Sequence, residues 1–279
     1  MKVALLQYPI AWADKETNLR LAEERIAALA GKADVAVLPE MFATGFCTDH
    51  PELAEGMDGE IMKRLQEVAN KSGVAIVGSF ICLPDTRYPI SDNRAKLCNR
   101  GFMIKPHQKP ITDSEASDNR YPIEIQDKRH LYAHGGEDKF FERANERHIF
   151  EYKGVKILLL VCYDIRFPVW ARNSSGYDYD LILVVANWPD IRIQYWDALI
   201  AARATENQCY IAAVNCVGDD GMGLHYNGHS VAYDTRLQPI VSFADNEEAT
   251  KIAEFDINKL HHFREVLPLW KDVDDFSLQ

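Results

Sequence analysis

Three residues with reactive or charged side chains each follow a short apolar run of the sequence. They are Glu40, Lys128 and Cys162, and the apolar runs before them cover residues 35–38, 123–125 and 157–161. If these runs are strands of an α/β sheet, their carboxyl ends are where reactive groups collect. A thiol beside a carboxylate base can act as a nucleophile, so the three residues together form a candidate site for covalent catalysis.

Each of the three residues also has an ordinary structural interpretation. A glutamate at the end of a strand is usually solvated, and a lysine there is usually salt-bridged. A cysteine in an apolar run is usually a small core residue. Position alone does not decide between the two interpretations, although three such residues in one chain are less readily explained by chance.

Apolar runs and helical patterns alternate along the chain and predict the elements that position these residues. Predicted strands cover residues 2–7, 35–38, 74–81, 100–104, 123–125, 155–161, 181–186, 209–214, 230–233, 240–243 and 252–255. Predicted helices lie around residues 19–29, 61–69, 193–200 and 257–266, with glycines at 31 and 73 ending the first two. Strands buried on both faces and alternating with helices indicate one α/β domain with helix-covered sheets. The polar residues 106–121 are expected to form a long surface loop, and the chain after Pro268 an extended tail.

Composition excludes several classes of protein. The chain has 279 residues and a net charge of −11, which argues against nucleic acid or an anionic membrane as the main partner. The longest strongly apolar stretches, residues 157–163 and 181–188, are far shorter than the ~20 residues of a membrane-spanning helix. The six cysteines form no C-x-x-C pair, and a chain with a large core does not need disulfides. We therefore expect a reduced, cytoplasmic protein.

Three blocks of sequence surround the candidate residues. They read P-E-M-F-x-x-G-F at 39–46, D-K-R-H-L at 127–131 and C-Y-D-x-R-F-P at 162–168, with weaker support at 186–189 and 201–207. In this order they resemble the nitrilase superfamily of carbon–nitrogen hydrolases, and most of all its omega-amidase branch, which hydrolyses the terminal amide of 2-oxo-dicarboxylic acid monoamides. The resemblance implies a four-layer αββα sandwich, with a hydrolase domain over residues 1–265 and a C-terminal tail over 266–279.

The resemblance also implies a role for each matching residue. Glu40 stands where the family has its general base, Lys128 where it has its catalytic lysine, and Cys162 where it has its nucleophile. Glu137 lies where many members carry a second glutamate that supports the lysine. In this chemistry the thiol forms a thioester as ammonia leaves, and Glu40 moves the protons. Lys128 and the backbone N–H of Tyr163 then stabilise the oxyanion.

The expected substrate is a small omega-amide with a free carboxylate, such as 2-oxoglutaramate or 2-oxosuccinamate. An anionic substrate needs a local cation in a chain of charge −11, and Arg166, four residues past the nucleophile, is a candidate. Arg166 could instead pair with Asp164, and Trp188 could be a pocket wall or a packing residue. Aliphatic amides, N-carbamyl amino acids and nitriles stay open as substrates. A non-catalytic binding protein is the remaining alternative. Such a protein could have lost one of the three reactive residues, but this chain keeps all of them.

Other site types have weaker support in the sequence. His130, His134 and Glu137 have spacings that could suggest a metal site, and His225 and His229 repeat the first spacing, but H-E-x-x-H is absent. No dinucleotide-binding glycine motif and no local cysteine-protease signature is present. We expect no metal and no organic cofactor, and the family implies a homodimer or a higher homo-oligomer.

Overall fold

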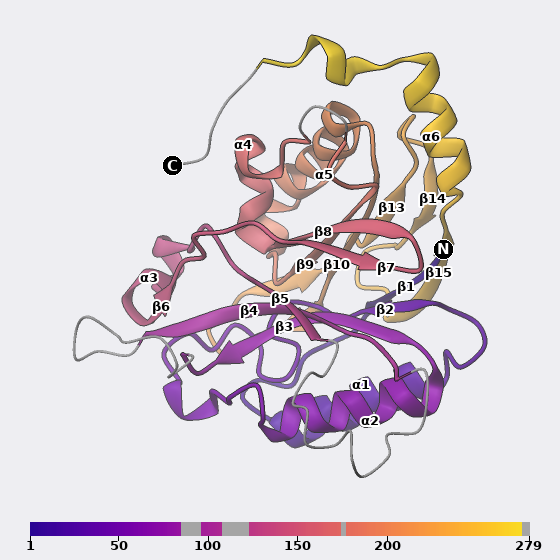
Figure 1. Cartoon of the computed structure of the whole chain (residues 1–279). Coiled ribbons are helices and arrows are strands. Elements are labelled where there is room, and N and C mark those ends of the chain that lie inside the picture. Colours follow the sequence, from indigo (N-terminus) through magenta and orange to yellow (C-terminus); the bar gives the residue numbers. More distant parts are fainter. Residues whose placement is uncertain (85–95, 108–122, 174–176, 275–279) are drawn as a thin grey trace.

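Two β-sheets face each other in the computed structural model, and helices cover the outer side of each sheet (Figure 1). The structure describes residues 1–84, 96–107, 123–173 and 177–274. The first sheet has the strand order β15-β1-β2-β3-β4-β5, with β6 beside β4. Its strands are β1 (Lys2–Gln7), β2 (Val35–Val37), β3 (Ala75–Cys82), β4 (Leu97–Ile104), β5 (Ile123–Asp127), β6 (Phe141–Glu142) and β15 (Ala249–Glu254).

The second sheet has the strand order β14-β13-β10-β9-β8-β7. Its strands are β7 (Ile149–Tyr152), β8 (Val155–Val161), β9 (Leu181–Ala186), β10 (Tyr210–Asn215), β13 (Val231–Tyr233) and β14 (Pro239–Ser242). The central strands β8, β9 and β10 are parallel, as are β1, β2 and β3 of the first sheet. A separate hairpin joins β11 (Val217–Asp219) to β12 (His225–Asn227).

Helices form the two outer layers. The helices are α1 (Lys15–Ala27), α2 (Glu60–Ser72), α3 (Glu137–Phe140), α4 (Pro168–Ala171), α5 (Ile193–Asn207) and α6 (Ile257–Val266). Short 3-10 turns are η1 (Pro51–Leu53), η2 (Ala133–Gly135), η3 (Cys162–Arg166), η4 (Asp190–Arg192) and η5 (Leu269–Asp272). In Figure 1, α1 and α2 lie against the first sheet and α4 and α5 beyond the second. The layer order is therefore the αββα sandwich that the family resemblance implies.

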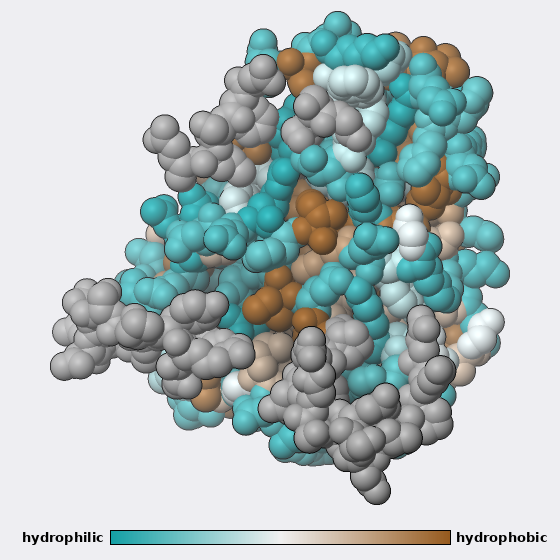
Figure 2. Space-filling model, viewed as in Figure 1, coloured by the Kyte–Doolittle hydropathy of each residue, from teal (hydrophilic) through white to brown (hydrophobic). Residues whose placement is uncertain are grey.

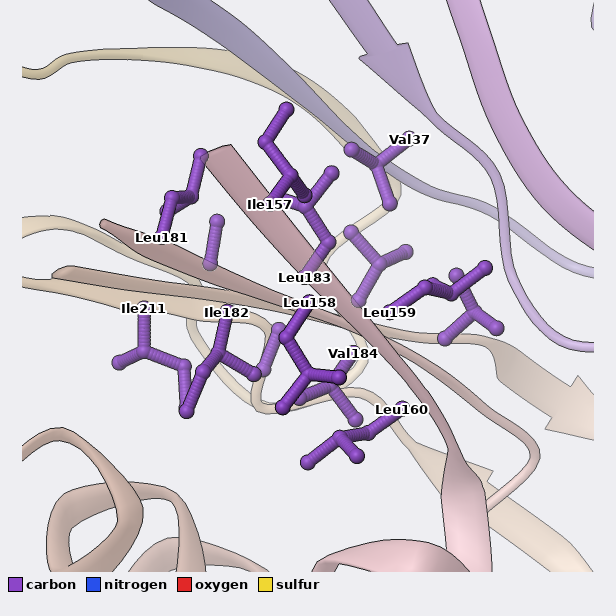
Figure 3. Packing of buried hydrophobic residues seen from close by; sticks show 14 of the residues in the cluster. Val37, Ile157, Leu158, Leu159, Leu160, Leu181, Ile182, Leu183, Val184 and Ile211 are labelled. Atoms are coloured by element: carbon purple, nitrogen blue, oxygen red, sulfur yellow. The ribbon is translucent and has the colours of Figure 1, made fainter. Parts of the chain in front are cut away.

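The period-2 alternation of strand side chains sorts the apolar residues into two cores. In β1, Val3 and Leu5 belong to the core between the sheets, whereas Ala4 and Leu6 pack under α1 and α2. Figure 3 shows the same alternation in β8, where Ile157 and Leu159 point toward Val37 of the first sheet. Trp196 and Ile200 of α5 pack on the other face of the second sheet. Removing a large side chain from such a core lowers the free energy of unfolding by roughly 2–5 kcal/mol. This packing holds the strands in place, and with them the residues at their ends.

Local signals set several element boundaries. The Asp14 carboxylate accepts the Thr17 N–H at 3.1 Å and caps the start of α1. Gly73, with φ of 72°, ends α2 in the left-handed conformation that glycine adopts without strain. Lys153 and Gly154, with φ of 49° and 75°, make the two-residue turn between β7 and β8.

The structure corrects three of the sequence predictions. Helix α1 ends at Ala27, ahead of the expected glycine stop at Gly31, because a turn over the next residues brings Leu29 into the core. Strand β4 begins at Leu97, since its pairing with β3 continues to Cys82. The chain after Pro268 turns through η5 and is not simply extended. Of the predicted loop 106–121, residues 108–121 lie outside the described part of the chain.

The surface agrees with the composition. Figure 2 shows mostly hydrophilic residues on the face viewed, with smaller apolar patches between them. Among the described residues, no helix has both the length and the apolar character that crossing a membrane requires.

Candidate active site

The turn after β8 presents Cys162 at the end of its strand. The residue opens η3 with φ of 47°, which is an uncommon conformation for a side chain other than glycine. The Asp164 carboxylate holds this turn by accepting the Val161 N–H at 3.2 Å and the His130 N–H at 2.9 Å. The His130 ring nitrogen Nδ1 lies 2.8 Å from the same carboxylate. The segment that follows β5 is thereby tied to the turn that carries the thiol.

A buried cluster of one ammonium and two carboxylates lies beside this turn. The Lys128 Nζ is 2.9 Å from Glu40 Oε1 and 2.9 Å from Glu137 Oε2. The Lys128 residue is only 1% exposed, and both glutamates are fully buried. The Asn99 side-chain amide donates to Glu40 at 2.8 Å and to Glu137 at 3.0 Å, while the Tyr132 N–H donates to Glu137 at 2.7 Å. The Lys128 ammonium is therefore held by two carboxylates, and hydrogen bonds from Asn99 and Tyr132 hold those carboxylates in turn.

Burial and charge act in opposite directions on this cluster. Burial alone lowers the pKa of Lys128, but the negative charges of Glu137 and Glu40 outweigh burial and hold that pKa above its usual range. Burial raises the pKa of Glu137, against the pull of the Lys128 charge. The lysine is consequently a permanent cation at neutral pH.

The Cys162 thiol is the neutral member of the site. Burial and then the adjacent charge of Glu40 raise the pKa of Cys162 well above its usual value. The thiol donates to the Asn187 carbonyl oxygen at 3.8 Å, and the Asn187 N–H donates to Glu40 Oε2 at 2.9 Å. Since the resting sulfur is protonated, nucleophilic attack needs a base, and the Glu40 carboxylate is beside it.

A cavity of about 320 Å³ opens beside the thiol. Its lining includes Lys128, Cys162, Tyr163, Arg166, Trp188 and Arg192. The Arg166 guanidinium lies 4.7 Å from the Trp188 ring centre and 5.2 Å from that of Tyr195. The Arg192 guanidinium lies 5.4 Å from the Tyr132 ring centre. Within the described ranges, neither guanidinium has a carboxylate partner, so both are available to an anion in the cavity.

Two of the open alternatives are decided by these contacts. Asp164 binds His130 and not Arg166, so the ion pair considered between Asp164 and Arg166 is absent from the described structure. Trp188 is a pocket wall and also a packing residue, because its Nε1 donates to the Arg192 carbonyl at 2.8 Å and its ring packs on Trp196.

The histidines considered as metal ligands have other contacts. His130 binds Asp164, and Glu137 binds Lys128, so the spacing of His130, His134 and Glu137 does not produce a ligand set. His225 lies against Asp219. Among the described residues, no group of three or more histidine, cysteine, aspartate or glutamate side chains could hold a metal ion.

Sequence reasoning missed three residues of the site. Asn187 directly follows β9, so the rule that singled out Glu40 and Cys162 could have found it. Arg192 lies in η4, four residues further along than the Trp188 that was noted. Asn99 lies inside β4, where no sequence signal separates a site residue from an ordinary polar strand residue.

Known proteins resemble this chain over nearly its whole length. A family model described as carbon-nitrogen hydrolase matches residues 2–265. Omega-amidase YafV of Escherichia coli is 37% identical over 100% of this chain and 98% of its own. A 2-oxoglutaramate amidase of Bacillus subtilis is 31% identical over 97% of this chain and 96% of its own. The crystal structure of a CN-hydrolase superfamily protein from Xanthomonas campestris, with an arsenic adduct in its active site, matches with a TM-score of 0.89 and 34% identity over 100% of this chain and 99% of that one. The chain therefore belongs to the carbon–nitrogen hydrolase family of the nitrilase superfamily and is an enzyme similar to omega-amidases.

Proposed function

We propose that the protein hydrolyses the terminal amide of a small omega-amide that carries a carboxylate, of the 2-oxoglutaramate or 2-oxosuccinamate type, to the acid and ammonia. The observation that carries the proposal is one cavity lined by the Cys162 thiol and the Lys128 ammonium, with the Glu40 carboxylate buried against them. The wall of this cavity carries the Arg166 guanidinium, which has no carboxylate partner among the described residues. The names of the relatives from Escherichia coli and Bacillus subtilis support the same substrate class.

The proposed reaction begins with attack of the Cys162 sulfur on the amide carbonyl carbon. Glu40 takes the thiol proton as the carbon–sulfur bond forms, and the carbonyl oxygen becomes an oxyanion. The oxyanion is stabilised by the Lys128 ammonium and the Tyr163 backbone N–H. The carbon–nitrogen bond then breaks, and Glu40 returns the proton to the departing ammonia, which leaves a thioester.

The second half of the reaction regenerates the thiol. Water attacks the thioester carbonyl while Glu40 takes its proton, and the oxyanion contacts are used again. The carbon–sulfur bond breaks, the carboxylic acid leaves, and the sulfur recovers the proton from Glu40. Glu137 is a positioning residue here, since it touches Lys128 and not the reacting atoms. The arsenic adduct in the Xanthomonas campestris relative is consistent with a soft nucleophile in such a site.

Recognition of the carboxylate falls to the cavity wall. Three rings surround the Arg166 guanidinium, since the Tyr163 ring centre lies 5.8 Å away in addition to those of Trp188 and Tyr195. The aromatic faces hold the cation without neutralising it. A guanidinium can bind a carboxylate through two parallel hydrogen bonds, so Arg166 can fix both the position and the orientation of the substrate.

The substrate proposal predicts a large preference for the charged omega-amide. Esterifying the substrate carboxylate, or using butyramide, is expected to lower kcat/KM by ~10²-fold or more, because a polar partner in the pocket is left unpaired. Measuring kcat/KM for a nitrile and for an N-carbamyl amino acid as well ranks these other activities of the family against the proposed one.

Variants of Arg166 test which residue reads the carboxylate. Arg166→Ala is expected to remove the preference for the acid over its ester while hydrolysis of butyramide continues. Lys139→Ala, which removes a different cation from the cavity lining, is the matched control and is expected to keep the preference. Equal rates of the wild-type enzyme on butyramide and the omega-amide acid refute the substrate assignment.

We also propose that the enzyme assembles as a homodimer in a reducing compartment such as the cytoplasm. All six cysteines are free thiols, which supports the compartment. Large apolar side chains are exposed on neighbouring elements, with Val169 of α4 53% exposed, Ile191 of η4 71% and Tyr195 of α5 58%, and these support an interface.

Light scattering during size-exclusion chromatography tests the assembly. The wild-type chain is expected to elute at twice the 31.8 kDa of one chain. Ile191→Asp should shift it toward the monomer, because the change places a charge in the proposed interface. Leu237→Asp changes an exposed leucine in the turn between β13 and β14 and should leave the mass unchanged. A monomeric wild-type protein contradicts the proposal.

A further inference from the structure

Asn187 contacts the two proposed catalytic groups through its main chain. It follows β9 directly, and its N–H donates to Glu40 Oε2 at 2.9 Å while its carbonyl oxygen accepts the Cys162 thiol at 3.8 Å. One peptide segment thus touches the carboxylate that would take the proton and the thiol that would give it up. A shift of this segment changes the position of one group relative to the other.

The Asn187 side chain fixes that segment in two directions. Its Nδ2 donates to the main-chain oxygen of Glu40 at 2.6 Å, which ties the end of β9 to the chain after β2. Its Oδ1 accepts the Cys216 thiol at 3.0 Å. Both ends of the amide are therefore occupied, one by Glu40 after β2 and one by Cys216 after β10.

The register of the second sheet explains why Cys216 is in place to do this. Strands β9 and β10 are parallel, with Ala186 opposite Asn215, so the residues that follow them lie side by side. The Cys216 side chain is buried, at 2% exposure, and burial raises the pKa of Cys216 well above its usual value. The thiol stays a hydrogen-bond donor, and a donor distinguishes the oxygen of an amide from its nitrogen.

We infer that Asn187, held in one amide orientation by the Cys216 thiol, is the positioning residue that sets Glu40 against Cys162. The inference rests on the proposed catalytic roles of Glu40 and Cys162. Without the Cys216 donor, the oxygen of the partly buried Asn187 side chain loses its partner, and only the Glu40 carbonyl still holds the amide in this orientation. The segment that carries both main-chain contacts is then fixed from one side only, and it moves. Cys216 acts through Asn187 and touches no substrate atom.

Two cysteines at opposite ends of the same strand provide a matched experiment. Cys209 precedes β10 and Cys216 follows it, and both are buried. The Cys209 sulfur lies 4.0 Å from the Arg203 carbonyl oxygen. Cys209 does not line the active-site cavity. Replacing either with alanine removes one buried sulfur from the same sheet, so the loss of packing is comparable. Only Cys216→Ala removes the donor to Asn187.

Cys216→Ala is expected to lower kcat by roughly 10- to 100-fold with KM little changed, because a small displacement of reacting groups has an effect of that size. The alkylation of Cys162 by iodoacetamide, followed by peptide mass spectrometry, should slow in parallel. Cys216→Ser keeps a donor and should recover most of both rates. Cys209→Ala should lower the melting temperature to a similar extent while both rates stay at the wild-type level.

Two results overturn the inference. One is a Cys216→Ala enzyme whose kcat and alkylation rate match those of Cys209→Ala, and the other is a Cys216→Ser enzyme no better than the alanine variant. Alkylation by iodoacetamide needs no amide substrate, so a wrong substrate assignment leaves this comparison valid. If the wild-type enzyme hydrolyses no omega-amide but its Cys162 alkylation depends on Cys216 as described, the proposed substrate fails and the positioning role stands.

Discussion

Cys162→Ala is expected to abolish amide hydrolysis, with a fall in kcat of at least about 10⁴-fold, while the protein stays folded. Removing the nucleophile removes the covalent route, and in a comparable enzyme the loss of such a residue costs about 10⁶-fold. The alanine fits the site, because it removes only the Cys162 sulfur, which lies 3.8 Å from the Asn187 carbonyl oxygen and beside Glu40. Circular dichroism and thermal unfolding check the fold, and ammonia release checks the rate.

The wild-type enzyme should carry the matching covalent signature. Intact-protein mass spectrometry during turnover should show the mass of the acyl group, and peptide mapping should place that mass on Cys162. Cys98 is an internal control, since it is more exposed than Cys162, burial raises its pKa to about 12, and it does not line the active-site cavity. An adduct on Cys98 or another cysteine, with activity lost in parallel, contradicts the thioester on Cys162.

The sequence predicted the longer strands and helices, with some ends misplaced, and three of the site residues that follow strands, but not Asn187. Buried strands such as β9, and β8 after Lys156, are continuous apolar runs, and their ends are marked by the polar or reactive residue that comes next. Glu40, Lys128 and Cys162 could be proposed together for that reason, although they are 88 and 34 residues apart in pairs. The resemblance then supplied the layer order, which the strand pattern alone does not contain.

Contacts between residues near in sequence were the harder part. Asp164 and Arg166 are two residues apart, and in the η3 turn such positions do not face each other. Asp164 turns back to His130, while Arg166 extends to Trp188. Pairings such as Lys2 with Glu254, which bring β15 beside β1, depend on the whole chain and leave no local signal.

The polar residues that orient the site were equally hidden. Asn99 has its role because β4 passes between Glu40 and Glu137, and an asparagine in a strand reads as an unremarkable residue. Cys216 reads as a small core residue, and it is one, since its side chain is buried. What the sequence could not show is the amide oxygen that its thiol meets. Hydrogen bonds of this kind, in which one side chain orients another residue of the site, depend on side-chain orientation and not on residue type.

Lys128→Arg should lose most of the activity although the charge is kept. The Lys128 ammonium sits 2.9 Å from a carboxylate oxygen on each side, in a space that leaves the residue 1% exposed. A guanidinium is a wide planar fork and cannot place a single donor at the same point. Since one oxyanion donor typically contributes ~10²–10³ in rate, kcat is expected to fall by that factor. A variant that keeps more than about a tenth of the wild-type rate contradicts this role.

A comparison with Lys128→Met separates the charge of Lys128 from its geometry. Methionine fills the space of the lysine stem but leaves Glu40 and Glu137 facing each other without a cation. Breaking a buried ion pair in this way costs about 3–5 kcal/mol, so Lys128→Met should unfold at a clearly lower temperature than Lys128→Arg. Lys139→Arg, at the exposed rim of the cavity, controls for the substitution itself and should keep the wild-type rate and melting temperature. If the arginine variant is inactive and stable while the methionine variant is inactive and unstable, the charge holds the buried cluster together and the shape of the ammonium serves the reaction. If both variants lose stability equally, the loss of rate in Lys128→Arg reflects a damaged fold, and the oxyanion role loses its support.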